Sequence, residues 1–176
     1  MTPEQFPVLL REATVKDHAD VAKICRASGR TPWSLEALAP IPGRVAIVAT
    51  VSGEVVGVAK THLQEEAEGD APAGHYLGGL VVDPRRRRKG LGSVLTNARL
   101  EWIWERSHCA FYFTDAVNTA SIELHRHFGF VPIATAPTIR GVSADDEGGN
   151  VVLHEAVAAP GGHRRIRRSS PPVGSR

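Results

Sequence analysis

The stretch HYLGGLVVDPRRRRKGLG, residues 75–92, decides the fold of this chain. Residues 76–82 form a short apolar run of β-prone side chains, which is typical of a strand covered on both faces. Asp83-Pro84 ends this strand, because proline cannot donate to a β-ladder and keeps the residue before it out of the helical region. An apolar-periodic segment begins at Leu91. The stretch therefore predicts a buried strand, a basic loop and the first turn of a helix.

The loop between that strand and that helix has the composition of a phosphate-binding loop. Five consecutive cations, residues 85–89, precede Gly90-Leu91-Gly92. Glycine lets the backbone approach a ligand closely, and a helix N-terminus offers unpaired N–H groups and a favourable dipole. The loop has no GxxxxGK[ST] pattern and two of the three glycines of a dinucleotide fingerprint, which excludes both of those classes. The alternative interpretation is a solvated basic turn.

The same loop resembles the acyl-CoA loop of the GNAT acetyltransferase superfamily, R/Q-x-x-G-x-G/A after a strand. Arg87, Gly90 and Gly92 occupy the fixed positions of that pattern. A second stretch, NTASIELHRHFGF at residues 118–130, resembles the other recurrent GNAT motif, N-x-x-A-x-x-x-Y-x-x-x-G-F. The second likeness rests on five positions, with a serine at the small-residue position and a histidine at the tyrosine position: Asn118, Ser121, His125, Gly129 and Phe130. Together the two likenesses cover residues 44–136.

The resemblance implies an α/β fold in which a mixed sheet of about seven strands is flanked by about four helices. The residue pattern predicts strands at residues 6–11, 44–51, 55–63, 76–82, 109–114, 130–136 and 150–157. It predicts helices at residues 15–28, 33–39 and 118–128, and one of about fifteen residues from residue 91. That last helix is expected to bury the face formed by Leu91, Val94, Leu95, Ala98 and Trp102. Residues 137–149 are expected to be a loop.

Composition predicts one domain, residues 1–157, followed by a basic tail at residues 158–176. The tail is rich in Pro, Gly, Ser and Arg and is expected to be disordered. Its five arginines make the net charge of the whole chain +2, whereas residues 1–156 carry 16 basic and 19 acidic side chains and are therefore mildly acidic. A mildly acidic body argues against a nucleic-acid partner.

No stretch approaches the ~18 uninterrupted apolar residues of a membrane span, and the N-terminus does not have the pattern of a signal peptide. We therefore expect a cytoplasmic protein without a membrane partner. Cys25 and Cys109 are isolated cysteines on apolar faces, so both are expected to be free thiols in a reducing compartment. No cysteine–histidine cluster has zinc spacing, and no metal is expected.

The resemblance implies acetyl-CoA as cosubstrate and assigns its binding residues. Backbone groups of residues 80–82 would bond the pantetheine arm, N–H groups of residues 87–92 would hold the pyrophosphate, and an asparagine would bond the arm or its vicinity. The cofactor-binding residues expected on this basis are Leu80, Val81, Val82, Arg87, Arg88, Lys89, Gly90, Leu91, Gly92 and Asn118.

Acetyl transfer to an amine needs a neutral amine, a donor for the oxyanion and a proton for the leaving thiolate. His125 stands where the family often keeps a tyrosine acid, although a structural helix histidine is the alternative. The glutamate that many members carry on the fourth strand is replaced by Gly78-Gly79-Leu80. Asp115, after the fifth strand, is the first candidate for the base and Asp83 the second. A water chain or an amine of low pKa would serve equally.

These residues predict an N-acetyltransferase that moves an acetyl group from acetyl-CoA to a primary amine of a small molecule in a ternary complex. The short N-terminal helices and the acidic loop at residues 64–70 leave room for a compact cationic acceptor. Two alternatives remain open: acetylation of a protein N-terminus or lysine, and a non-catalytic GNAT module that binds acyl-CoA. By resemblance, a homodimer formed through the C-terminal strands is expected.

Overall fold

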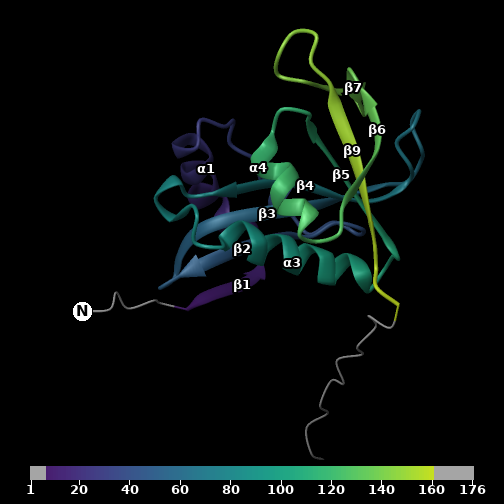
Figure 1. The fold of residues 1–176 in the computed structure, drawn as a ribbon. Helices are drawn as coiled ribbons and strands as arrows, with labels where there is room; N and C mark the ends of the chain where they lie inside the picture. Colours follow the sequence, from purple (N-terminus) through teal and green to yellow (C-terminus); the bar gives the residue numbers. More distant parts are fainter. Residues whose placement is uncertain (1–6, 161–176) are drawn as a thin grey trace, which may run out of the picture.

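A mixed seven-stranded sheet in the order β1-β2-β3-β4-β5-β9-β6 organises the molecule (Figure 1). The computed structural model describes residues 7–160. Within the sheet, β4 and β5 run parallel and every other neighbouring pair is antiparallel. Its strands are β1 (Val8–Glu12), β2 (Ala46–Val51), β3 (Glu54–Gln64), β4 (Gly74–Val82), β5 (Cys109–Asp115), β6 (Val131–Ala136) and β9 (Val151–Val157). The predicted α/β fold and its order of elements are confirmed.

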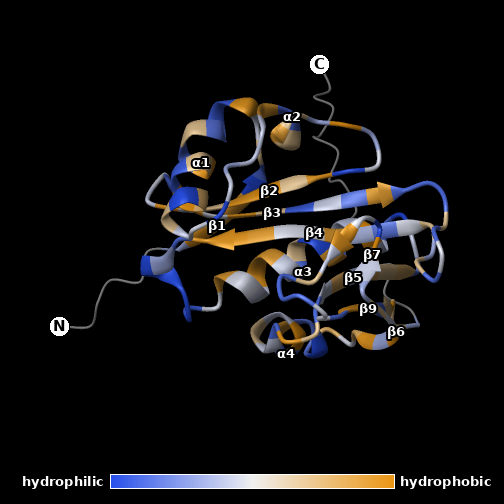
Figure 2. Ribbon diagram, turned by 90° about the horizontal axis from the view of Figure 1, so that it is seen from above, coloured by the Kyte–Doolittle hydropathy of each residue, from blue (hydrophilic) through white to orange (hydrophobic). Residues whose placement is uncertain are grey.

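Helices cover both faces of the sheet (Figure 2). The 3-10 turn η1 (Val15–Asp17), α1 (His18–Ala27) and α2 (Leu35–Leu38) lie on one face, and α3 (Leu91–Trp104) and α4 (Thr119–Arg126) lie on the other. Every residue of β2 is buried, because Ala46 and Val48 pack toward α1 whereas Ile47 and Ala49 pack toward α3. This two-sided burial explains the unbroken apolar run of that strand.

The buried face of α3 differs from the predicted one. Leu91 and Leu95 are buried as expected, whereas Val94 is 39% exposed. Thr96 and Arg99, two polar residues, are fully buried instead. The prediction was wrong here because apolar periodicity cannot register a polar side chain that finds partners in the sheet below it.

β4 is irregular in two ways, a β-bulge on its β3 side and an early divergence from β5, and both lie at the functional site described below. Ala59 of β3 pairs with Leu80, but Thr61 pairs with Leu77, so Gly78 and Gly79 together face one residue of β3 in a β-bulge. On its other edge β4 pairs with β5 only at residues 75–76, after which the two strands diverge. Among residues 7–160, the β5-facing edge of residues 77–82 is therefore left without a strand partner.

The segment predicted as a loop at residues 137–149 contains a small hairpin, β7 (Thr138–Ile139) and β8 (Val142–Ser143). Two-residue strands are too short to produce a periodic signal, so the sequence pattern could not reveal them. The turn between them places Arg140 and Gly141 at positive φ, 48° and 73°. This turn carries Arg140 back toward the sheet.

Cys25 and Cys109 are free thiols, as expected. None of the helices in the described part of the chain is long and apolar enough to cross a membrane. Across residues 7–160, no group of three or more His, Cys, Asp or Glu side chains is placed to hold a metal ion. Residues 161–176, most of the predicted basic tail, lie outside the described residues.

Candidate active site

A cavity of about 1150 Å³ lies where β4 and β5 diverge. Its walls are residues 76–82 of β4, residues 112–114 of β5, the basic loop and the first turns of α3 and α4. Nine of the ten expected cofactor-binding residues line this cavity, and Lys89 does not: Leu80, Val81, Val82, Arg87, Arg88, Gly90, Leu91, Gly92 and Asn118. The structure thus brings the two sequence motifs to one cavity.

The basic loop is fixed at its start and open at its end. The buried carboxylate of Asp83 accepts hydrogen bonds from the backbone N–H of Arg85 at 2.9 Å and from its guanidinium at 2.7 Å, and these bonds lower the pKa of Asp83. The chain then makes the 3-10 turn η2 (Pro84–Arg86) and enters α3 through Gly90, whose φ is 80°. A Cβ at Gly90 would meet no atom within 4 Å.

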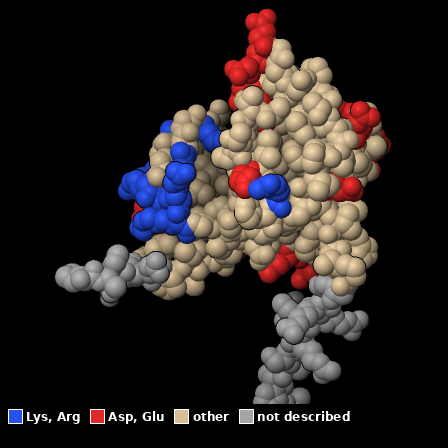
Figure 3. Space-filling view, viewed as in Figure 1, with Lys and Arg blue, Asp and Glu red and all other residues tan. Residues whose placement is uncertain are grey.

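Cations surround this helix N-terminus. Side chains of residues 85–89 are exposed or half-buried and gather on one edge of the molecule (Figure 3). The first N–H groups of α3 have no intrahelical acceptor, and the helix dipole adds positive potential there. A loop with free N–H groups, positive potential and no side chain at Gly90 is suited to a pyrophosphate.

Asn118 caps α4. Its side-chain oxygen accepts a hydrogen bond from the N–H of Ser121 at 3.2 Å, and its amide group donates to the hydroxyl of Thr114 at 3.1 Å. These bonds join the start of α4 to the end of β5 at the cavity wall. Gly129, at a φ of 84°, ends the same helical segment as the motif predicted.

His125 and Tyr112 form a buried polar pair in the cavity wall. The ring of Tyr112 lies between His125, 4.0 Å away between centroids, and His154, 4.6 Å away. Nδ1 of His125 lies 2.8 Å from the carbonyl oxygen of Ser121. Neither Nε2 of His125 nor the hydroxyl of Tyr112 has a hydrogen-bond partner among residues 7–160. Both side chains are more than nine-tenths buried, so both groups are unsatisfied donors or acceptors beside the cavity.

Burial shifts the pKa values of His125 and Tyr112 and thereby determines which of the two carries a proton at neutral pH. It lowers the pKa of His125 to about 4 and raises the pKa of Tyr112 to about 12. Neutral His125 donates from Nδ1 to Ser121, so its Nε2 presents a lone pair. At neutral pH the available proton of the pair is therefore on Tyr112, which argues against His125 as the acid. Sequence reasoning missed Tyr112 because it lies in an apolar strand and has the pattern of a core residue.

Neither carboxylate predicted as a base lines the cavity. Asp115 accepts hydrogen bonds from the N–H groups of Val117 at 3.1 Å and Asp145 at 2.9 Å, and it thereby connects the end of β5 to a distant loop. Asp83 is occupied by Arg85 as described above. Both carboxylates therefore hold backbone in place outside the cavity wall.

The β4 bulge is supported from below by Arg99 of α3. Nη1 of this fully buried guanidinium lies 3.1 Å from the carbonyl oxygen of Gly78 and 3.3 Å from that of Lys60, and Nη2 lies 3.0 Å from the hydroxyl of Thr96. Burial lowers the pKa of Arg99 to about 9, which still leaves it cationic at neutral pH. Arg99 thus supplies donors to carbonyls at the irregular part of the β3–β4 ladder.

His62 lies on the opposite side of this bulge. It is paired across the ladder with Tyr76 and lines the cavity. A Cβ at Gly78 would lie 2.7 Å from both Cδ2 and Nε2 of His62, so the imidazole edge rests against the glycine backbone. Burial, with the charges of Lys60 and Arg44, lowers the pKa of His62 to about 4. Sequence reasoning missed His62, although a histidine in the apolar part of a strand was an available signal.

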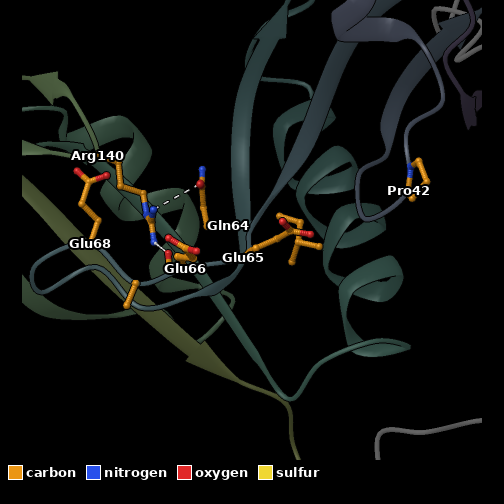
Figure 4. Close-up of a pocket in the computed structure, with 8 residues that line it drawn as sticks. Pro42, Gln64, Glu65, Glu66, Glu68 and Arg140 are labelled. Carbon is orange, nitrogen blue, oxygen red and sulfur yellow. Dashed lines mark hydrogen bonds between the residues drawn. The ribbon is translucent and has the colours of Figure 1, made fainter.

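A smaller cavity of about 590 Å³ adjoins the first and shares Gln64 and Arg140 with it (Figure 4). Arg140 donates hydrogen bonds to the carbonyl oxygens of Glu66, Ala71 and Pro72 at 2.7, 3.2 and 2.9 Å. The acidic loop that follows β3 is therefore held in place by a cation from the β7–β8 turn.

Comparison with known proteins identifies the class. The model of the acetyltransferase (GNAT) family matches residues 15–130, more than half of the chain. The chain therefore belongs to the GNAT acetyltransferase family, as the two motifs indicated.

Individual relatives agree with this assignment. The chain is 38% identical over 82 residues to the mycothiol acetyltransferase of Thermobispora bispora and 31% identical over 103 residues to the aminoglycoside N(6')-acetyltransferase type 1 of Klebsiella aerogenes. These matches cover 45% and 56% of this chain but only 27% and 66% of the two relatives.

A protein assigned as a streptothricin acetyltransferase from Bacillus anthracis, solved in complex with acetyl coenzyme A, superposes with a TM-score of 0.68 at 15% identity. The superposition covers 87% of this chain and 99% of that protein. At this identity the likeness shows the fold alone.

Proposed function

We propose that this protein transfers an acetyl group from acetyl-CoA to a primary amine of a small molecule, by direct attack in a ternary complex. The observation that carries the proposal is the composition of the cavity between β4 and β5. One end is a cationic loop with free helix N–H groups, and the middle is an unpaired strand edge. The wall beside them contains two buried polar groups that have no hydrogen-bond partner in the described part of the chain.

Each of these features fits one part of acetyl-CoA. The N–H groups of residues 87–92 would hold the pyrophosphate, with Arg87 and Arg88 as counter-charges. The unpaired edge of residues 80–82 would bond the amide groups of the pantetheine arm in the manner of an added strand. Asn118 would act through the α4 cap that it forms at the wall. Lys89 would contribute charge from outside the cavity.

The chemistry follows from the same wall. The thioester supplies an activated acetyl carbonyl, and the amine nitrogen attacks its carbon. We propose that backbone N–H groups of the β4 bulge stabilise the charge that develops on the carbonyl oxygen, with Arg99 holding the bulge. Tyr112 is protonated at neutral pH and would donate to the departing sulfur. His125, stacked on Tyr112, would position that ring.

A small-molecule acceptor is supported by two observations. One of the two relatives described above is an aminoglycoside N(6')-acetyltransferase. The acceptor end of the cavity adjoins a loop that carries exposed glutamates at residues 65, 66 and 68. We further propose a cytoplasmic location, supported by the two free thiols, and a catalytic domain at residues 1–157 that does not need the basic tail. The homodimer, and the absence of nucleic-acid and membrane partners, stay predictions.

The test is release of CoA thiol from acetyl-CoA by the purified protein with a panel of amines. The panel would pair aminoglycosides, amino acids and polyamines with short peptides that have free N-termini or lysines. Release with a small amine is expected, whereas release with peptides alone would redirect the function to protein acetylation. Saturable acetyl-CoA binding without release from any acceptor would contradict catalysis.

The cofactor loop is tested separately by Gly90→Glu. This substitution places a carboxylate at the proposed pyrophosphate site and forces a side chain into a φ of 80°. We expect acetyl-CoA affinity to fall by at least about tenfold. The matched control is Gly53→Glu, which occupies a similar φ of 82° in the β2–β3 turn, away from the cavity. Equal affinity in the two variants would refute the loop assignment.

A further inference from the structure

We propose that His62 is the base that accepts the proton of the attacking amine. The inference rests on the proposed function, and it assigns the catalytic role that neither Asp115 nor Asp83 can fill from its position. No carboxylate side chain projects from residues 74–82 of β4, and the candidate comes instead from the neighbouring strand β3.

Geometry is the first support for His62. Its ring edge touches the backbone at Gly78, as the 2.7 Å separation from the position of a Cβ there shows. Gly78, Gly79 and Leu80 form the bulged part of β4 that lines the cavity, and His62 lines the same cavity beside them. Any side chain at Gly78 would displace the imidazole. The imidazole of His62 can therefore lie beside the bulge only because residue 78 is a glycine.

The second support is that His62 has no competing partner. Among the described residues neither of its ring nitrogens forms a hydrogen bond with another protein group, and its neighbours along the strand face are Lys60 and Gln64. In contrast, His125 and His127 each bond a carbonyl of α4 through Nδ1. A histidine without a protein partner at a cavity wall is free to bond a ligand.

The surroundings of His62 keep it in the base form. Besides burial, the cations Lys60 and Arg44 disfavour its protonation, and Arg140 faces the same cavity. Lys60 itself lies over the ring of Trp33, 4.4 Å from its centroid, and its own pKa is lowered by burial and by Arg44. The same charges disfavour an ammonium ion in this place. An acceptor amine held here therefore loses its charge more readily, and attack needs the neutral amine.

The proposed step balances in atoms and electrons. The amine nitrogen forms a bond to the acetyl carbon with its lone pair, and its N–H proton passes to the unprotonated ring nitrogen of His62. The C–S bond breaks, and the sulfur leaves with the bonding pair and takes a proton from Tyr112. His62 then returns its proton through the cavity to solvent, and Tyr112 is reprotonated in the same way. The products are an N-acetyl amine and CoA thiol.

The experiment compares His62→Gln and His62→Ala with the parent, using the best amine from the panel. His127→Gln is the matched control, because His127 is an exposed residue directly after α4 and does not line the cavity. Acetyl-CoA affinity is measured first and is expected to stay within about twofold for all variants. We expect kcat to fall by about 10²-fold in both His62 variants, the lower end of the usual contribution of a general base, because an imidazole of low pKa accepts a proton less readily. Added imidazole should restore part of the kcat of His62→Ala.

Failure of the His62 assignment and failure of the proposed function would give different results in this experiment. If His62→Gln retains kcat within about threefold of the parent, or if His62→Ala loses kcat without any response to imidazole, His62 is not the base. Both of these outcomes leave the proposed function intact, because the parent still turns over. A parent that releases no CoA with any amine overturns the proposed function, and this inference with it.

Discussion

The contact between Gly78 and His62 gives a prediction whose size can be worked out from the structure. In Gly78→Ala the new methyl group would lie 2.7 Å from Cδ2 and Nε2 of His62 and 3.0 Å from Cγ of Lys60. Ordinary contact begins near 3.4 Å, so the imidazole must move by about 0.7 Å or more. Gly78 is not among the glycines at positive φ, so alanine can adopt its backbone conformation and the cost is one of packing.

Overpacking of this kind costs about 1–3 kcal/mol of the free energy of unfolding. For a chain of this length, that cost corresponds to a melting temperature lower by about 2–12 °C. The imidazole is only half-buried and can retreat toward the cavity, so we expect the lower part of this range. Acetyl transfer should fall more steeply than stability, because the retreat moves the proposed base away from the bulge.

A double-mutant cycle tests this reasoning. Parent, Gly78→Ala, His62→Ala and the double variant are unfolded in urea, and their free energies of unfolding are compared. Truncation of His62 removes the closer of the two contacts, so Gly78→Ala should cost at least about 0.5–1 kcal/mol less in the His62→Ala background. The contact with Lys60 keeps the residual cost above zero. If the two single costs add to within about 0.3 kcal/mol, the imidazole does not rest against Gly78 and the reasoning fails.

Three further predictions concern other parts of the structure. Asp17 binds the guanidinium of Arg11 at 2.7 and 2.8 Å, which holds the pKa of Asp17 at about 2. Because the folded-state pKa of Asp17 lies below the ordinary value of 3.8, the pair stabilises the fold above pH 4 and loses this contribution between about pH 4 and 2. Asp17→Asn should remove the contribution, which is at most about 2 kcal/mol of the free energy of unfolding and less because solvent screens the half-exposed Arg11. Urea titrations of parent and variant across this pH range measure the difference. Tyr112→Phe should bind acetyl-CoA but lose about tenfold or more in kcat, whereas His125→Gln should lose less; the reverse order would return the acid role to His125. Arg140→Ala should increase amide exchange in residues 64–72, because it removes three hydrogen bonds to carbonyl oxygens of this loop, and unchanged exchange would show that other contacts hold the loop.

The sequence was sufficient to predict the fold because its informative features are local. A strand that ends at Asp83-Pro84, a glycine that opens α3 and a glycine that ends α4 each specify backbone conformation within a few residues. Gly90 and Gly129 occupy positive φ in the structure, where glycine is tolerated best. The cavity at the junction of the two motifs follows from these elements and their order.

The catalytic side chains could not be predicted in the same way, because their roles depend on contacts between distant segments. Asp115 lies at the end of β5, which is why the sequence predicts it as a base, but its carboxylate accepts a hydrogen bond from the N–H of Asp145, 30 residues further along the chain. Arg99 has the sequence pattern of an exposed helix residue, yet it is fully buried, and two carbonyl oxygens accept from it there, that of Gly78 in the β4 bulge and that of Lys60 opposite it in β3. The pKa of Tyr112 is raised by burial, to which His125 of α4 and His154 of β9 contribute from distant parts of the chain.

Gly78 and Gly79 explain why the bulged part of β4 contains no side chain that could act as the base. A side chain at residue 78 would occupy the space in which His62 lies, and a Cβ at residue 79 would come within 2.7 Å of Trp33. The two glycines therefore admit groups from β3 and from the segment after α1 to the bulge, where a bulkier β4 would exclude them. On the proposed assignment, the absence of a carboxylate at residue 78 of β4 and the presence of His62 in β3 are one structural feature, because the imidazole of His62 lies where a side chain at residue 78 would be. Gly78→Glu should thus impair acetyl transfer rather than supply a base, since the glutamate side chain would displace the imidazole of His62 from its place beside the bulge.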